Sequence, residues 1–218
     1  MWFAPVNTID LIIKGFLIGV VASAPMGPVG VLCIQRTLNK GRWYGFVTGV
    51  GAAFSDIVYA LLMGFGMSFI IDFIEDKDNM FYLQLAGSVM LFIFGLYTYR
   101  SDPTRIIRPT SPKKGTLVHN MMTGFLITFS NPLIIFLFVA LFARFTFVVP
   151  DHFIQQSLGY VSILIGALVW WFALTYAIDK VRTRFDVKRI RTVNKGIGIV
   201  VIIAAVAGVI ITLAGLSL

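Results

Sequence analysis

The residues of this chain best placed to do chemistry are one interior acid and two proline-containing interruptions of apolar segments. Asp56 is the one acidic residue deep inside a long apolar run. An ionisable side chain inside a membrane segment costs at least ~2.5–3.5 kcal/mol on insertion scales and marks a functional site by default. Its carboxylate could pair with a substrate ammonium, or carry a proton because burial disfavours the charged form. The alternative is a structural aspartate bonded to Ser55, Tyr59 or a neighbouring helix.

The small residues just before Asp56 indicate a close helix contact. Gly49, Gly51, Ala52 and Ala53 leave one face of this segment without large side chains. Small residues let two membrane helices approach closely. We expect them to pack against the first apolar segment, which would bring Asp56 close to the interruption in that segment.

The first interruption is Ala24-Pro25-Met26-Gly27-Pro28, inside an apolar run from about residue 11 to 34. Pro25 and Pro28 lack the backbone N–H that a continuous helix needs. We expect a second half-helix to begin at Pro28, with Gly27 as its cap. Its free N–H groups would face a cavity as an anion site, and they belong to Val29, Gly30 and Val31. The alternative is a kink that serves only packing.

The second interruption is Ser130-Asn131-Pro132. Asn131 is a favourable N-cap and Pro132 suits the first helical position, although the Asn131 amide could also contact substrate. Thr128 and Ser130 could bond back to a carbonyl that Pro132 frees. The segment Gly124-Phe125-Leu126-Ile127 precedes this interruption as Gly15-Phe16-Leu17-Ile18 precedes the first. The paired interruptions indicate an internal repeat.

Composition defines the class of protein that carries these interruptions. The chain has 218 residues, of which 58% are hydrophobic and 13% charged, whereas a soluble domain carries about 25% charged residues. Its apolar runs are continuous and near the ~20 residues that span a bilayer, not the alternating strands of a barrel. We read the first run as a retained span rather than a signal peptide. The sequence predicts an all-α membrane protein.

The predicted architecture is six transmembrane helices arranged as two inverted three-helix repeats, with proline-broken first and fourth helices. An odd number of spans per repeat forces the second repeat to lie inverted, as in many secondary transporters. We expect one transporter domain over residues 1–218. Repeat 1 is expected at about 8–100, the linker at about 101–116 and repeat 2 at about 117–218. The six spans are expected at about 10–34, 45–71, 81–99, 117–143, 157–178 and 196–214.

The loops between these spans alternate between loops rich in Lys and Arg and loops that contain few of them. Most of the 18 Lys and Arg residues fall in the first, third and fifth loops; Arg36, Lys40 and Arg42 make up the first set. By the positive-inside rule these loops are cytoplasmic, which puts both termini outside. We assign the basic loops to topology and lipid head groups rather than to nucleic acid.

Several classes of chemistry find no signature in the chain. There is no P-loop, nucleophile elbow or zinc motif, so we predict no catalytic residue, no cofactor and no metal site, and energy from an ion or substrate gradient. His119 and His152 have no partner at metal-ligand spacing, and the single cysteine, Cys33, cannot cycle as an internal dithiol. Trp170 and Trp171 either pack or form a wall of the cavity.

These motifs resemble the LysE/RhtB-type amino-acid exporter family of the LysE superfamily. The resemblance is carried by Pro25-Met26-Gly27-Pro28, the glycine-rich segment up to Asp56 and Tyr59, and Ser130-Asn131-Pro132. It implies export of amino acids or related small solutes across the bacterial inner membrane, driven by protons through alternating access. The expected substrate and coupling residues are Pro25, Gly27, Pro28, Val29, Asp56, Asn131 and Pro132.

The chain departs from many family members beside both interruptions. Val29-Gly30 follows the first Gly-Pro and Leu133-Ile134 follows the Asn-Pro, where members often carry polar side chains. These changes remove side chains that could recognise the substrate, so they leave its identity open between an apolar solute and one of unknown class.

Two other functions stay open at this level. A heavy-metal exporter of the same superfamily is disfavoured because soft metals need thiolate or imidazole ligands. A non-transport membrane subunit would tolerate apolar replacements of Asp56 and Asn131. The small-residue-rich last segment, 196–218, could pack in the bundle or form a homodimer.

Overall fold

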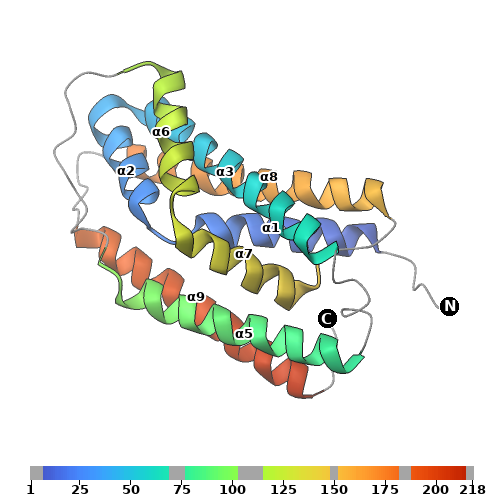
Figure 1. The fold of residues 1–218 in the computed structure, drawn as a ribbon. Coiled ribbons are helices and arrows are strands. Elements are labelled where there is room, and N and C mark those ends of the chain that lie inside the picture. Colours follow the sequence, from blue (N-terminus) through green and yellow to red (C-terminus); the bar gives the residue numbers. More distant parts are fainter. Residues whose placement is uncertain (1–6, 69–76, 103–114, 148–151, 182–187, 215–218) are drawn as a thin grey trace.

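The fold is entirely helical in the residues that can be described. The computed structural model describes residues 7–68, 77–102, 115–147, 152–181 and 188–214, which form eight helices and no strand (Figure 1). The helices are α1 (Thr8–Ser23), α2 (Pro28–Lys40), α3 (Arg42–Ser68), α5 (Lys77–Arg100), α6 (Leu117–Phe129), α7 (Pro132–Phe145), α8 (Phe153–Lys180) and α9 (Lys188–Leu213). Most of the predicted linker, residues 103–114, lies outside the described residues.

The two predicted helix breaks are present. Four helices, α3, α5, α8 and α9, are long and apolar enough to cross a membrane, or six spans exist if each bent pair counts as one. The pair α1 and α2 bends by 77°, and the pair α6 and α7 bends by 70°. With these segments the chain is a multi-pass membrane protein.

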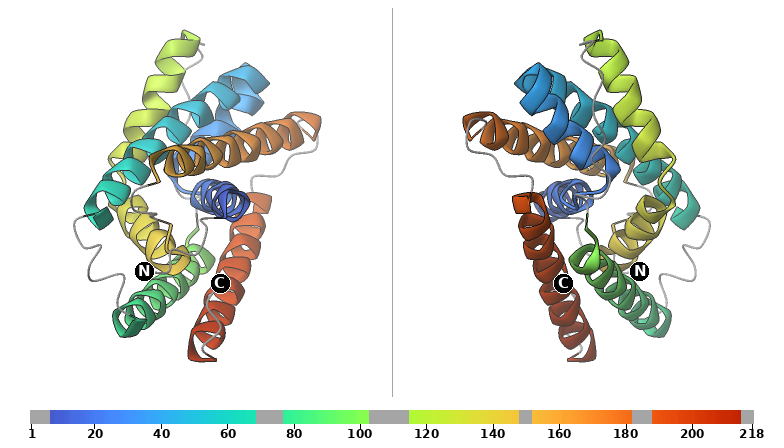
Figure 2. Two further views of the ribbon diagram at one scale, coloured as in Figure 1. Left: turned by 90° about the vertical axis from the view of Figure 1, so that its right-hand side faces the viewer. Right: turned by 90° about the vertical axis from the view of Figure 1, so that its left-hand side faces the viewer.

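The helices form two layers. One layer is the pair α5 and α9, which lie side by side at the bottom of Figure 1 and in both views of Figure 2. In the other layer α1 packs along α8, α6 along α3, and α2 against α3. Helix α7 packs against α5 and also touches α1 and α3, so it connects the two layers.

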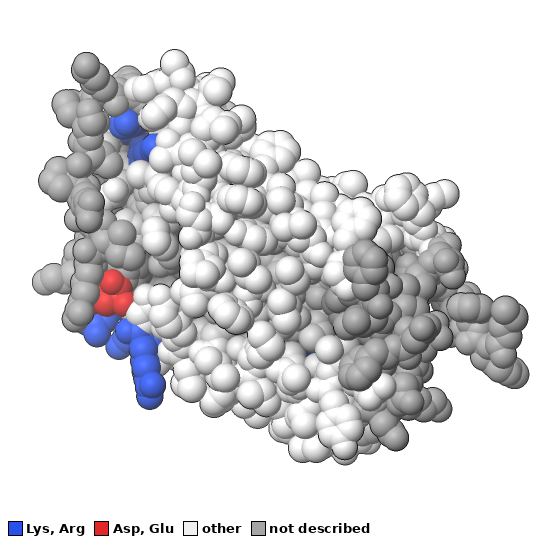
Figure 3. Space-filling view, in the orientation of Figure 1, with Lys and Arg blue, Asp and Glu red and all other residues white. Residues whose placement is uncertain are grey.

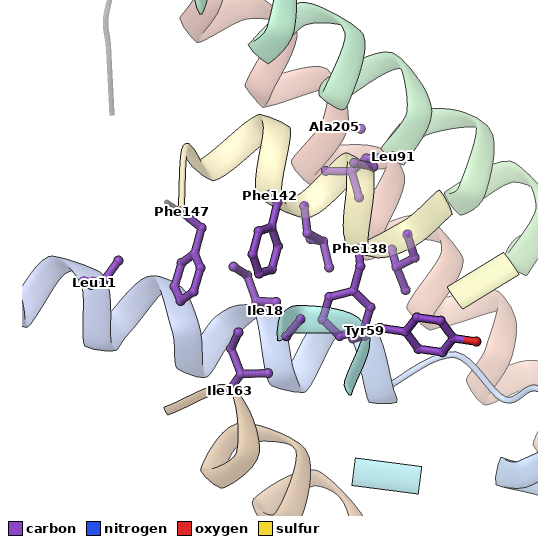
Figure 4. Close-up of a cluster of buried hydrophobic side chains, with 14 residues drawn as sticks. Leu11, Ile18, Tyr59, Leu91, Phe138, Phe142, Phe147, Ile163 and Ala205 are labelled. Carbon is purple, nitrogen blue, oxygen red and sulfur yellow. The ribbon is translucent and has the colours of Figure 1, made fainter. Parts of the chain in front are cut away.

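Large apolar side chains fill the space around α7. Figure 4 shows Phe138 and Phe142 of α7 pointing toward Ile18 of α1, with Leu91 of α5 on the other side. These side chains are at most 5% exposed, and between membrane helices such contacts stabilise the fold by van der Waals packing rather than by the exclusion of water. We call the set of buried residues drawn in Figure 4 the α7 cluster.

Two glycines at equivalent places in the two halves allow close helix contacts. A Cβ atom on Gly15 of α1 would meet the backbone carbonyl oxygen of Gly159 in α8. A Cβ atom on Gly124 of α6 would meet the backbone carbonyl oxygen of Thr48 in α3. Both glycines open the shared Gly-Phe-Leu-Ile segments, so the internal similarity marks equivalent contacts between helix backbones.

In the view of Figure 3 the visible charged side chains of the described residues gather at one end of the molecule. Figure 3 shows blue and red atoms at the left edge, where α2, α5 and α8 end and α6 and α9 begin, and a mostly white middle. Large apolar side chains such as Phe65, Ile93 and Val200 are each at least 60% exposed, as expected where lipid is the solvent. We call this end of the molecule the basic end.

The three basic residues assigned to the first loop all lie in helices, with Lys40 ending α2 and Arg42 beginning α3. Arg36 lies inside α2 and is only 6% exposed. Its Nη1 donates hydrogen bonds to Thr48 Oγ1 at 2.8 Å and to the Asn120 carbonyl at 2.9 Å. The placement was wrong because α2 continues past the apolar run, and Arg36 ties it to α3 and α6.

Candidate functional site

A cavity lies where the two helix breaks meet. It has a volume of about 150 Å³, the size of an engineered protein cavity that holds benzene. Its walls come from the ends of α1, α5 and α6, the two breaks with the starts of α2 and α7, two residues of α3, and one residue each of α8 and α9. Of the seven predicted site residues, those that line the cavity are Pro25, Gly27, Pro28, Val29, Asp56 and Asn131. Pro132 follows directly in α7 but is not a lining residue.

Asp56 of α3 is the buried acid of this cavity, at 2% exposure. Ser23 Oγ, at the end of α1, donates a hydrogen bond of 3.0 Å to its Oδ2. Its Oδ1 is buried and has no hydrogen-bond partner among the described residues. Ser55 and Tyr59, the predicted structural partners, make no hydrogen bond to it, since Tyr59 donates to the Phe129 carbonyl. One carboxylate oxygen is therefore left for a cation or a proton.

The first break presents the N-terminus of α2 to the cavity. Gly27 is the N-cap, Pro28 occupies the first turn, and no side chain caps the helix. The Val31 N–H donates to the Gly27 carbonyl at 3.1 Å, so its predicted place in an anion site was wrong. The free amides of the first turn are those of Val29 and Gly30. The helix dipole gives this end partial positive charge.

The second break is closed by its own side chain. Asn131 Oδ1 accepts a hydrogen bond from the Leu133 N–H at 3.2 Å, and the Asn131 carbonyl accepts one from the Ile134 N–H at 3.1 Å. The first amides of α7 are thus occupied, whereas those of α2 are open. The cavity is therefore asymmetric, with uncapped helix amides at the α2 end and capped ones at the α7 end.

Tyr59 of α3 satisfies the carbonyl that the second break frees. Its hydroxyl donates to the Phe129 carbonyl, and its ring stacks on Phe129 with centroids 5.5 Å apart. The predicted back-bonding by Thr128 is wrong, because its buried Oγ1 has no partner among the described residues. Thr128 is a lining residue of the cavity.

The small residues before Asp56 divide between two sets of neighbours. Ala52 and Ala53 pack with Cys33 of α2, in the first segment, as predicted. Gly49 instead lies against the ring of Trp171 in α8, and Gly51 lies against the backbone of Met121 in α6. Asp56 reaches the first break through Ser23, so the expected proximity is present.

The comparison with known families decides the class of this site. The profile of the LysE type translocator family matches residues 20–212. The chain belongs to the LysE type translocators. Among curated proteins, the "Putative amino acid efflux protein YcgF" of Bacillus subtilis (strain 168) is 27% identical over 184 residues, covering 84% of this chain and 87% of that protein. No solved structure matches the chain at a significant level.

The sequence did not single out two polar contributors to the cavity of this LysE type translocator. Ser23 and Asn194 are 4% and 1% exposed and both line it. Ser23 is a single small polar residue among apolar neighbours, and Asn194 lies in a basic stretch whose composition is typical of a loop. Neither pattern predicts a cavity residue, so only the packing of the helices identifies them. Trp171 is a cavity wall, with its Nε1 buried and without a partner among the described residues.

Metal ligands do not gather in this translocator where it can be described. Within residues 7–68, 77–102, 115–147, 152–181 and 188–214, no three His, Cys, Asp or Glu side chains are placed to share an ion. Cys33 is fully buried and packs against Ala52, Ala53 and Trp171.

We predict that Asn131→Ala lowers stability by about 1 kcal/mol, as loss of an N-cap does. For a protein of this size that is roughly 2–4 °C in the thermal midpoint, measured by intrinsic fluorescence in detergent micelles. Asn131→Asp keeps an oxygen acceptor and should restore the midpoint. If Asn131→Ala instead leaves the midpoint unchanged and abolishes export, the side chain contacts substrate rather than capping α7.

Proposed function

We propose that this protein is a secondary active exporter of amino acids or related small solutes across the bacterial inner membrane. Protons drive it by alternating access. The one observation that carries the proposal is Asp56: a buried carboxylate in the wall of the cavity between the breaks, with one oxygen bonded to Ser23 and the other without a hydrogen-bond partner among the described residues. The Bacillus subtilis relative, which aligns with 84% of this chain, is named as a putative amino acid efflux protein, and that name supports an exporter.

The cavity offers complementary ends to a zwitterion. A substrate carboxylate would meet the open amides of Val29 and Gly30 at the start of α2. Its ammonium would meet Asp56 Oδ1, which has no other partner among the described residues. Apolar lining residues, among them Ile127, Leu133 and Ile134, suit a small apolar side chain.

Alternating access in this proposal rests on two inverted repeats. The helix contacts support the pairing: α1 packs on α8 as α6 packs on α3, and α5 pairs with α9, its counterpart. The half-helices differ, since α2 packs against α3 whereas its counterpart α7 packs against α5. An asymmetry of this kind is expected when one side of the cavity is closed and the other open.

The orientation in this proposal follows from the charges. Arg42, Lys180 and Lys195 lie near helix ends at the basic end, which the positive-inside rule places in the cytoplasm. Both termini then lie outside. Anionic lipid head groups would surround this end, and the face of α9 that carries Ile203 and Ile210, each more than 60% exposed, is available for a homodimer.

The test begins with the unknown substrate. Untargeted metabolite profiling compares the medium of overexpressing and deleted cells. We expect at least one amino acid or small zwitterion to rise on overexpression. Purified protein in liposomes loaded with that compound should then release it faster when a pH gradient is imposed.

The same cells separate the alternatives. Cadmium tolerance that depends on the gene, with no change in the medium's metabolites, would favour the metal exporter. If the gene changes neither cadmium tolerance nor the metabolites in the medium, a non-transport subunit is favoured and the proposal is contradicted.

A further inference from the structure

Asn194 of α9 is a buried amide that the proposed transport cycle leaves without a role. It is 1% exposed. Its Oδ1 accepts the Met26 N–H at 2.9 Å, and its Nδ2 donates to the Thr98 carbonyl at 2.7 Å. A longer contact of 3.4 Å reaches the Ser101 carbonyl. One side chain thus joins the first break to the end of α5 and to α9.

The partners of Asn194 are backbone groups that have no hydrogen-bond partner in their own helix, one in the first break and one at the end of α5. Met26 lies between the prolines of the first break and is itself only 3% exposed. The Thr98 carbonyl belongs to the last turn of α5, where helix carbonyls have no intrahelical donor. An amide carries an acceptor and two donors on one planar group, so a single asparagine satisfies both sides.

The position of this bond matters because it crosses between the layers. Met26 belongs to the layer of α1, α2, α3, α6 and α8, while Thr98 and Asn194 belong to the α5–α9 layer. Asn194 lies in the first turns of α9, at the basic end (Figure 1). The α7 cluster joins the same two layers further toward the other end (Figure 4). The cavity lies between these two connections.

We propose that Asn194 is a positioning residue that latches the α5–α9 layer onto the first break and closes the cavity toward the basic end. Loss of the latch lets the layers part there while the α7 cluster holds them together elsewhere. The break is released at the same time, so the α2 amides lose their fixed orientation toward the cavity. The inference rests on the proposed function, because the sidedness of the cavity has meaning only in a membrane transporter.

Chemical labelling of one cavity thiol tests the latch without any knowledge of the substrate. The background is Cys33→Ser with Ala22→Cys, since Ala22 lines the cavity and is 5% exposed. The probe is a membrane-impermeant trimethylammonium methanethiosulfonate. It is added to inside-out vesicles, which expose the cytoplasmic face, or to right-side-out vesicles. Adding Asn194→Leu should raise the labelling rate about tenfold in inside-out vesicles only, the shift expected from losing one net hydrogen bond.

Matched variants distinguish a latch from ordinary packing. Asn120→Leu makes the same change at another fully buried asparagine, whose Nδ2 donates to Thr116 at the start of its own helix, and should leave labelling unchanged. Asn194→Asp keeps the shape and the acceptor for Met26 but loses the donor for the Thr98 carbonyl, so it should label faster than the unsubstituted background and more slowly than Asn194→Leu. Asn194→Ser, which is too short to bridge the layers, replaces the leucine variant if that one does not fold.

Two outcomes would overturn the latch. Equal rises from both faces, with a lower thermal midpoint, would mean that Asn194 only maintains packing. Unchanged labelling from both faces would mean that the bond closes nothing. Neither result bears on export by the unsubstituted protein, which the metabolite and liposome assays measure separately.

Discussion

Asp56→Asn is expected to reduce export driven by a pH gradient to the background rate while the protein still folds. The amide has the shape of the carboxylate and keeps an oxygen for the Ser23 hydroxyl, but it can neither carry a proton nor pair with a substrate ammonium. A hydrogen bond to a charged group is worth about 1.5–3 kcal/mol, so substrate binding should weaken about 10- to 100-fold. Liposomes loaded with the profiled substrate measure both effects.

An exchange assay separates the two roles of Asp56. Substrate-for-substrate exchange without a pH gradient requires binding and movement but no net proton transfer. If Asp56 only carries the proton, the asparagine variant should keep exchange and lose gradient-driven export. If it also binds the ammonium, both should fall. Gradient-driven export at the unsubstituted rate would remove Asp56 from the mechanism, and a matching thermal midpoint shows that the fold is intact.

Gly124→Leu is expected to have the largest effect on the fold itself. Even a Cβ atom at this position meets the backbone carbonyl of Thr48 in α3, and a backbone cannot move aside as a flexible side chain does. Overpacking of a close contact costs about 1–3 kcal/mol or more, which corresponds to a midpoint lower by roughly 5–10 °C. Intrinsic fluorescence in detergent micelles and size-exclusion chromatography measure the loss.

Gly66→Leu is the matched control for that loss. Gly66 lies in α3, where a Cβ atom would have nothing within 4 Å, and the same substitution there should leave the midpoint within about 1 °C. An equal loss at both positions would show that leucine is harmful for reasons other than the α3–α6 contact. Gly15→Leu, at the equivalent place between α1 and α8, should behave like the change at Gly124.

The breaks were predictable because their causes are local. Pro25, Pro28 and Pro132 remove backbone donors in apolar surroundings, and no tertiary contact can restore an N–H that proline lacks. Membrane spans are equally local, since their length must match the bilayer. The carboxylate of Asp56 is likewise visible in the sequence, because a charge inside such a span demands an explanation.

The partners of these residues were not predictable, because they depend on which helix faces meet. The sequence suggested Ser55 and Tyr59 as partners of Asp56. In the folded protein α3 is oriented so that Asp56 faces Ser23 and Tyr59 faces the second break. The cap of α7 is the exception: the residue type of Asn131 predicted it, and the hydrogen bond from the Leu133 N–H confirms it.

The amino-acid sequence alone determined that the chain is apolar and helical, that two of its segments are interrupted, and that it carries an interior acid. Each of these is a property of a few consecutive residues. The tertiary structure alone decided which side chains line the cavity between the interruptions, that Arg36 is buried, and that Asn194 bridges α9, the end of α5 and the first break. The physical reason is that hydrogen bonds and close contacts between helices join residues as many as 168 positions apart. Their pairing is set by packing of whole helices, which no local pattern encodes.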